Sequence, residues 1–387
     1  MALGHWLQLS LTDGIGPILS RRIIEAAGNV ENACSASADL LANVEGIGLA
    51  KSRKIAAALK KAVADAEEEF ARCAKAGVLL VCPDDQAYPL LLRSIPDPPN
   101  VLYLRGTLEP RDLNAVGIVG SRKCSFYGRE QAERFGALLA GSGFCVISGG
   151  ARGVDSAAHR GALSHPQGRT IAVLGSGVNV PYPAENAALF DQIAERGVVI
   201  SEYPLGTSPA KENFPRRNRI VSGMSRGVFI IEADERSGAL ITARQAGEDH
   251  GRPVFALPGR VDNPLSSGPH LLIRDGATLV MKLDDIIEGL GPLPAEAGEP
   301  GLFDPPAPAD VGEPLPKTPP KPASSTDYSG LSDRQKSILQ ALGDDSANVD
   351  LLVERTSLPV ETILQELTFL SLKGRVRRID GQTYAKR

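Results

Sequence analysis

The chain has 387 residues, of which 42% are hydrophobic and 23% charged, and its formal net charge is −4 at pH 7. This length allows two or three domains with at least one large core. The slightly acidic balance excludes a uniformly basic surface for nucleic acid, so a nucleic-acid site would have to be a local patch.

The sequence shows neither a targeting nor a metal-binding pattern. The five cysteines form no C-x-x-C pair and have no histidines at ligand spacing, which argues against zinc and against a disulfide framework. The segment MALGHWLQLS lacks the basic and apolar regions of an export signal, and no uncharged run reaches about 18 residues. We therefore expect a cytoplasmic protein with reduced thiols, no bound metal and no membrane contact.

Residues 1–72 are predicted to form a small helical domain. A Gly-Ile-Gly triplet at 14–16 recurs at 46–48, and each copy precedes a helical run with basic residues in its first turns. The pattern resembles helix-hairpin-helix modules, whose hairpin amides hold DNA phosphates. A domain of the sterile-alpha-motif type, used for protein contacts, fits equally well, so both interpretations stay open.

Residues 73–290 alternate short apolar runs with helical segments, the pattern of β-α-β units. This alternation predicts the α/β class, with one extended, Rossmann-like and mostly parallel sheet joined by right-handed helix crossovers. The predicted strands lie at residues 78–82, 101–104, 116–119, 145–147, 170–174, 198–201, 228–231, 254–257 and 278–280.

Two glycine-rich turns follow the predicted strands at 116–119 and 145–147. They contain small and basic residues: Gly120, Ser121 and Arg122 in the first turn, and Gly149, Gly150 and Arg152 in the second. Glycines let backbone N–H groups approach an anion, the following helix N-terminus attracts it, and arginines add donors, so we expect these turns to hold phosphates. Neither turn has the G-x-G-x-x-G or G-x-x-x-x-G-K-[ST] spacing, so no dinucleotide or ATP cofactor is expected.

The loop after the predicted strand at 198–201 is locally basic. Between residues 211 and 226 there are five basic residues and one acidic residue. An aromatic ring among basic side chains is suited to stack on a base whose phosphates those side chains bind, although a lone phenylalanine is also a common core residue. The candidate contacts in this loop are Lys211, Phe214, Arg216, Arg217, Asn218 and Arg219.

Several polar residues near the same sheet edge have simpler interpretations. Ser237 and Gly238 open the next helix and offer a third N-terminus that could face an anion. Asp155 reads as a helix cap, His159 as a packed helix residue, and Glu202 as a residue that pins its loop.

The chain ends in a proline-rich segment and a predicted winged helix. Residues 291–328 contain 11 prolines, which predicts a semi-rigid linker. Residues 329–387 show three helical segments, beginning near residues 332, 349 and 359, and then two strand-like runs around Asp380-Gly381. Basic residues such as Arg375 and Arg378 give this domain a face for weak contact with double-stranded DNA, but winged helices also serve protein contacts, so both roles stay open.

Six motifs in the same order resemble the DNA-processing protein A family (DprA/Smf) over residues 73–283. They are GSR at 120–122, SGGARGVDSAAH at 148–159, SEYPLG at 201–206, KENFPRRNRIVSG at 211–223, SGALITARQA at 237–246 and VFALPG at 254–259. The resemblance implies a homodimer that binds and protects single-stranded DNA and loads the recombinase RecA during natural transformation, with no known catalytic turnover. Carried over to this sequence, Gly120, Arg122, Lys211 and Phe214 form the DNA pocket, and Arg252 is the candidate for a further basic contact.

The alternative function is an enzyme that uses the same glycine-rich turns. It would be a nucleotide or phosphoribosyl hydrolase, as found among Rossmann-like proteins of the lysine-decarboxylase type. Such an enzyme needs a general acid or base, for which Glu202 and Asp155 are the candidates. The sequence brings together no pair of carboxylates or histidines, so we favour the binding function.

Overall fold

The computed structural model describes residues 2–291 and 293 and, nearer the C-terminus, 332–342, 347–356, 358–360, 362, 363, 366, 367, 370, 375–378 and 383–386. The chain divides into two compact units, Met1–Glu299 and Pro300–Arg387. Apart from residues 291 and 293, the predicted linker at 291–328 lies outside the described residues. Within the described part of the chain, every helix is too short or too polar to span a lipid bilayer.

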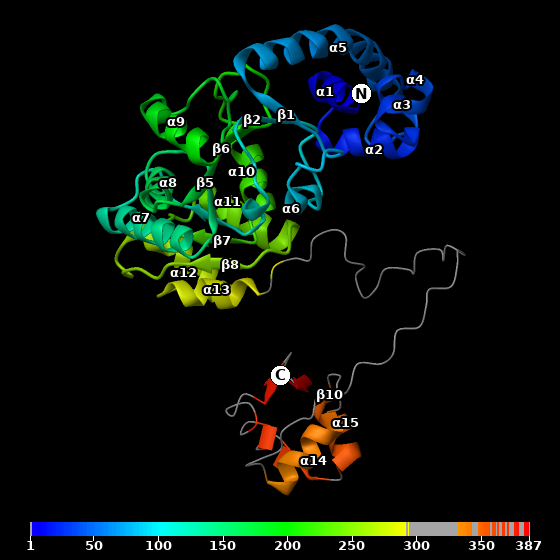
Figure 1. Ribbon diagram of the computed structural model, residues 1–387. Coiled ribbons are helices and arrows are strands. Elements are labelled where there is room, and N and C mark those ends of the chain that lie inside the picture. Colours follow the sequence, from blue (N-terminus) through cyan, green and yellow to red (C-terminus); the bar gives the residue numbers. More distant parts are fainter. Residues whose placement is uncertain are drawn as a thin grey trace, which may run out of the picture. The chain divides into compact units, whose positions relative to one another are not determined.

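The first unit is built on one nine-stranded sheet (Figure 1). Its strand order is β1-β2-β6-β5-β4-β3-β7-β8-β9. From β6 to β9 all neighbours are parallel, whereas β2 is antiparallel to both β1 and β6. The strands are β1 (Leu79–Val81), β2 (Leu102–Gly106), β3 (Ala115–Val119), β4 (Cys145–Ser148), β5 (Arg169–Val173), β6 (Val198–Ser201), β7 (Gly227–Ile230), β8 (Val254–Ala256) and β9 (Thr278–Leu279). The prediction of an α/β fold with one mostly parallel sheet is confirmed.

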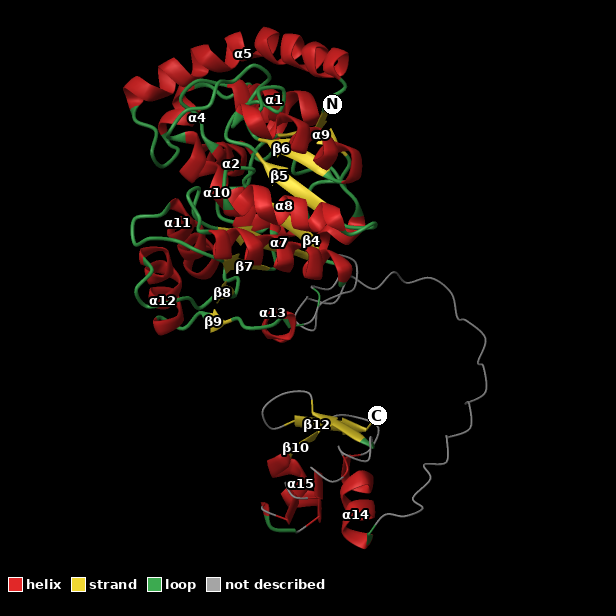
Figure 2. Cartoon of the chain, turned by 90° about the vertical axis from the view of Figure 1, so that its left-hand side faces the viewer, coloured by secondary structure: helices red, strands yellow, loops and turns green. Residues whose placement is uncertain are grey.

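Helices cover both faces of the sheet, which is why its central strands β3, β4 and β5 are buried at every position. In β3, Ala115 and Val119 belong to one core and Val116 and Ile118 to the other, because successive side chains of a strand alternate between faces. Helices α6, α10 and α11 pack in the first core, and α7, α8 and α13 pack in the second, where α7 and α8 lie in front of the sheet in Figure 2. The helices are α6 (Leu90–Arg93), α7 (Phe126–Gly141), α8 (Val154–Ser164), α9 (Ala187–Arg196), α10 (Asn213–Met224), α11 (Gly238–Arg244), α12 (Ser267–Arg274) and α13 (Leu283–Leu290).

The order of the strands reverses between β3 and β7. From β3 the chain adds β4, β5 and β6 outward in one direction, and α10 then returns it so that β7 pairs with the other side of β3. Open α/β sheets bind ligands at the carboxyl ends of the strands beside such a reversal. The turns that follow β3 and β7 therefore mark the expected ligand edge.

Five N-terminal helices precede the sheet and have a core of their own. They are α1 (Ala2–Leu11), α2 (Pro17–Ala27), α3 (Val30–Cys34), α4 (Ala38–Ala42) and α5 (Leu49–Ala76). The first glycine of each Gly-Ile-Gly triplet has a positive φ, 83° at Gly14 and 88° at Gly46, and a helix starts directly after each triplet. The two copies thus share one backbone conformation, as the sequence repeat predicts. The expected domain boundary at residue 72 falls within α5, and that boundary stays a prediction.

The second unit has a small helical core and a three-stranded sheet. It contains α14 (Asp333–Leu342), α15 (Val349–Thr356), β10 (Ala347–Asn348), β11 (Val376–Arg378) and β12 (Thr383–Lys386), with strand order β10-β12-β11. Ser332 and Gln335 cap α14 reciprocally, since the Ser332 hydroxyl accepts from the Gln335 N–H and the Gln335 side chain accepts from the Ser332 N–H. Parts of the third predicted helix and the predicted turn at 380–381 lie outside the described residues.

Candidate functional site

The turn after β3 is fixed by close packing and by the strand beside it. The Ser121 N–H donates to the carbonyl oxygen of Glu232, which follows β7, over 2.6 Å. A Cβ on Gly120 would lie 2.7 Å from Cγ2 of Val154 and 2.9 Å from the same carbonyl oxygen, so only glycine fits there. This fixed turn holds Arg122 at the carboxyl edge of the sheet, where its side chain is exposed.

Glu232 organises this edge, and the sequence analysis did not single it out. Its carboxylate is buried and accepts hydrogen bonds from the N–H and the hydroxyl of Ser125, both at 2.7 Å. Ser125 in turn caps α7, and Gly128 in the first turn of α7 packs so closely against Glu232 that a Cβ would overlap the carboxylate. An acidic residue directly after a buried apolar strand was the signal that could have identified it.

Arg122 stacks on the ring of Phe214, so the turn after β3 and the start of α10 meet. The guanidinium carbon of Arg122 lies 4.8 Å from the centroid of the Phe214 ring, a cation–π geometry. The ring of Tyr182 is on another side, with its centroid 5.5 Å from that of Phe214. Phe214 lies over Gly175, where a Cβ would approach Cδ1 to 3.0 Å, and its side chain is only partly buried. The ring is therefore an accessible platform rather than a core residue.

Lys211 lies three residues before Phe214, next to the first turn of α10, and its side chain is exposed. Within residues 2–291 no hydrogen bond or ion pair joins its ammonium group to another residue. We call Arg122, Lys211, Phe214 and Tyr182 the strand site. It combines two exposed cations with two aromatic rings on three connected segments of the sheet edge.

Arg217 is buried behind the strand site rather than exposed in it. Its guanidinium donates to the carbonyl oxygen of Val173 and packs against Gly149, where a Cβ would overlap it. Burial lowers the pKa of Arg217 to about 10, although the nearby carboxylate of Asp155 acts in the opposite direction. Burial also disfavours the charged form of Asp155 and so raises its pKa; this carboxylate accepts a hydrogen bond from the Ala151 N–H. These two groups support the turn after β4 from inside.

Arg219 is also committed to internal partners. Arg219 is 6% exposed, and its guanidinium binds the carboxylates of Asp97, at 2.9 Å, and Glu202, at 2.7 Å. Both candidate acids of the hydrolase alternative are thus engaged in the fold, Glu202 by Arg219 and Asp155 in the buried turn.

The other candidate residues do not join the strand site. Arg152 pairs with Glu185, and Arg252 donates to the Leu91 carbonyl and the Ser94 hydroxyl at 3.3 Å. The Ser237 hydroxyl caps α11 by accepting a hydrogen bond from the Ala239 N–H, and the Asn218 amide donates to the Gly238 carbonyl. Arg216 is exposed and lies near Gly16 of the N-terminal helices.

Helix α5 binds the loop that leads to Lys211. This contact between α5 and the loop was not predicted from the sequence. Buried Glu69 accepts from the Leu205 N–H at 2.7 Å, and Arg72 donates to the Leu205 carbonyl at 2.9 Å. Arg72 also pairs with Glu69 at 2.6 Å. The backbone N–H and carbonyl of Leu205 are therefore both bound by one turn of α5, which fixes the position of the loop that precedes Lys211.

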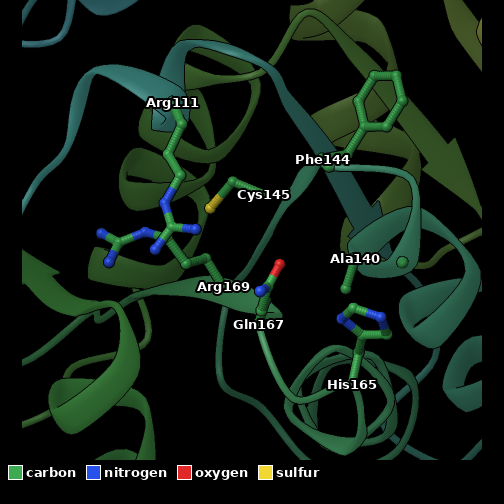
Figure 3. Close-up of a pocket in the computed structure, with 9 residues that line it drawn as sticks. Arg111, Ala140, Phe144, Cys145, His165, Gln167 and Arg169 are labelled. Carbon is green, nitrogen blue, oxygen red and sulfur yellow. The ribbon is translucent and has the colours of Figure 1, made fainter.

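A hollow of about 130 Å³ lies near the opposite edge of the sheet, at the start of β4 and β5 (Figure 3). Cys145, His165 and Arg169 are among its lining residues. Arg169 uses its donors internally, on Asp112 at 2.7 Å, on Glu109 at 2.7 Å and on two backbone carbonyls. Its charge is therefore compensated within the fold, and we assign no ligand to this hollow.

His159 gives the fold a specific pH dependence. It is fully buried in α8, and the Thr170 hydroxyl donates to the Val146 carbonyl, so His159 Nδ1 must donate to the Thr170 oxygen at 2.7 Å. Its Nε2 is buried without a partner among the described residues. Burial, with a contribution from Arg217, lowers the pKa of His159 from 6.5 to about 3.

Because folding lowers the pKa of His159, the unfolded chain takes up a proton at a higher pH than the folded protein does. The folded state therefore keeps its full stability above pH 6.5 and loses stability as the pH falls toward 3. We expect His159 to remove about 2 kcal/mol from the unfolding free energy between pH 7 and pH 5. Urea unfolding at both pH values measures this, and the pH dependence of His159→Asn should be smaller by that amount. The control His5→Asn, on α1, should keep the wild-type pH dependence, and an equal dependence in His159→Asn would contradict the assignment.

Comparison with known proteins places this geometry in a family. A family model described as DNA recombination-mediator protein A matches residues 79–291, and a second, described as the DprA winged helix domain, matches residues 316–382. Protein Smf of Synechocystis sp. is 34% identical over 395 residues, which cover 99% of this chain and 98% of that protein. The DNA processing protein DprA of Streptococcus pneumoniae is 44% identical over 203 residues, covering 52% and 71% of the two chains. The X-ray structure of DprA from Streptococcus pneumoniae aligns with a TM-score of 0.64 at 34% identity, over 74% of this chain and 98% of that one.

Proposed function

The chain belongs to the DprA/Smf family of DNA recombination-mediator proteins, and from that premise we propose that it binds single-stranded DNA at the strand site. The observation that carries this proposal is the stacking of the Arg122 guanidinium on Phe214, 4.8 Å from the ring centroid, with the exposed Lys211 three residues before Phe214 in the chain. Proteins that bind single strands without sequence preference combine such cations for phosphates with aromatic faces for bases. Double-stranded DNA keeps its bases stacked inside the helix and cannot use the rings in this way.

In the proposed mode, the phosphates of one strand lie against Arg122 and Lys211, and a base stacks on the open part of Phe214. Arg122 already contacts one side of the ring, and Tyr182 lies on another, so the ring is held before DNA arrives. A fixed platform lowers the ordering cost of binding. The glycine-rich turns after β3 and β4 serve in this account to bring the platform and cations together.

Membership of the family extends this proposal to the biological role of the protein, and the sequence of the terminal domains extends it to double-stranded DNA. We propose that the protein acts in the cytoplasm as a homodimer, protects the incoming strand and loads RecA onto it during natural transformation. The N-terminal helices and the winged helix domain are proposed to add a weak contact to double-stranded DNA. Binding, rather than turnover of the DNA, is the proposed activity.

Lys211→Ala is expected to weaken single-strand binding and to reduce its dependence on salt. Each phosphate contact on a single strand contributes about 0.7 to the slope of log affinity against log salt concentration. Loss of one contact should therefore lower the slope by about 0.7. Fluorescence anisotropy with a labelled oligothymidylate at several salt concentrations measures both values.

The matched control for Lys211→Ala is Arg134→Ala. Arg134 is an exposed arginine on α7, which packs on the opposite face of the sheet from α10. This control should keep the wild-type slope. Equal slopes for Lys211→Ala and wild type would remove Lys211 from the strand site.

A further inference from the structure

A groove of about 470 Å³ lies between the N-terminal helices and the α10–α11 face. Its apolar lining includes Pro17 and Ile18 from the first turn of α2, Pro215 from α10, and Ile241 from α11. Ile18 is 47% exposed and Ile241 43% exposed. Residues of α2, α10 and α11 line this one groove, so it is a part of the surface at which the N-terminal helices meet the sheet-bearing part of the same unit.

The groove carries an uncompensated positive charge. Arg216 lines it, its side chain is exposed, and no carboxylate pairs with it within residues 2–291. Asp97 also lines the groove, but its carboxylate is bound to Arg219 at 2.9 Å. An occupant that offers apolar faces together with negative charge is therefore favoured over a basic or a purely apolar one.

The groove continues the strand site around the first turn of α10. Phe214, Pro215 and Arg216 are consecutive, and residues two apart in a helix point about 200° apart, so Phe214 and Arg216 flank the start of α10 on opposite sides. A helix is only about 10–12 Å across with its side chains. A strand that crosses this turn from Phe214 therefore reaches the groove within a few nucleotides.

We propose that the groove binds a second stretch of the same single strand. Bases would pack against Ile18 and Ile241 while a phosphate lies against Arg216. The volume is within the range of about 300–1,000 Å³ that is typical of small-ligand pockets, which fits a nucleotide. This inference rests on the proposed binding of single-stranded DNA at the strand site, and it gives the N-terminal helices a direct part in that binding.

The test is a length series of oligothymidylates, measured by anisotropy with the full chain. The variants are Arg216→Ala and Ile18→Ala, both at exposed positions, with Arg134→Ala as the charge-matched control. The shortest oligonucleotides that bind should show equal affinity for wild type and both groove variants. Longer ones should bind about fivefold to tenfold more weakly to the groove variants, because only they reach the groove.

The outcomes separate this inference from the function on which it rests. If Phe214→Ala weakens binding at every length while the groove variants follow wild type at every length, the strand site stands and the groove is excluded. If the groove variants weaken the shortest oligonucleotides as much as the longest, the groove is no separate subsite and the inference is overturned. If wild type binds no oligonucleotide, both the inference and the proposed function fail.

Discussion

Phe214→Ala is expected to weaken single-strand binding by roughly tenfold or more while leaving the salt dependence unchanged. Stacking of one base on an aromatic side chain contributes about 1–3 kcal/mol, and this contribution involves no counterion release. The ring is partly exposed and already ordered by Arg122 and Tyr182, so its loss removes a preformed surface. Anisotropy titrations at several salt concentrations give both the affinity and the slope.

Two controls make the Phe214→Ala result specific. Phe70→Ala removes a 52% exposed ring on α5 that is outside the strand site, and it should bind as wild type does. Since Arg122 and Phe214 touch, the double variant Arg122→Ala/Phe214→Ala should lose less affinity than the sum of the single losses. Wild-type affinity for Phe214→Ala would show that no base stacks on this ring.

Arg219→Met is expected to lower the unfolding free energy by about 3 kcal/mol. Removal of one member of a buried charge pair leaves its partner buried without compensation, and such losses reach about 3–5 kcal/mol. Here two carboxylates lose their partner, Asp97 and Glu202, of which Glu202 is 12% exposed and Asp97 30%. The partial exposure of Asp97 places the expected value at the lower end. Urea unfolding followed by circular dichroism measures it.

The same variant distinguishes a structural arginine from one that contacts DNA. If Arg219 acts only within the fold, the folded fraction of Arg219→Met should bind oligonucleotides too short to reach the groove with nearly wild-type affinity. Arg134→Met, at an exposed position, should change stability by less than about 0.5 kcal/mol. A stable Arg219→Met that fails to bind DNA would reverse the assignment.

The sheet could be read from the sequence because its strands are short apolar runs between glycine-rich turns. Strands such as β3 and β4 are apolar on both faces, since helices cover both sides, and this produces a continuous run rather than an alternation. The antiparallel pairing of β2 with β6 was not predictable, because the apolar pattern of a strand does not say which strand is its neighbour. The start of a helix near residue 332 was predicted, and the Ser332 hydroxyl caps it by accepting from the Gln335 N–H.

The sequence identified three residues of the strand site, but it did not show which nearby arginines are buried. Arg122, Lys211 and Phe214 were chosen for charge and aromatic character, and the structure brings Arg122 and Phe214 into contact. Arg217 and Arg219 look the same in sequence, yet both are buried and bound inside the fold. Within α10, the position of a residue around the helix decides between these roles, and a run of basic residues does not reveal which side faces the core.

The N-terminal helices contribute more to the sheet edge than their sequence indicated. Glu69 and Arg72 of α5 bind the loop before Lys211, and α2 forms one wall of the groove beside α10. The local hydrophobic periodicity of a sequence does not reveal contacts between segments that are more than a hundred residues apart.

We expect a base of single-stranded DNA to lie on the ring of Phe214. Photocrosslinking tests it directly, with an oligothymidylate that carries 5-iododeoxyuridine, followed by mass spectrometry of the crosslinked peptides. The expected result is crosslinking to peptides that contain Phe214 or the adjacent Tyr182, with a sharp loss of crosslinking to the Phe214 peptide in Phe214→Leu. Crosslinks confined to other parts of the chain, with none at Phe214 or Tyr182, would contradict it.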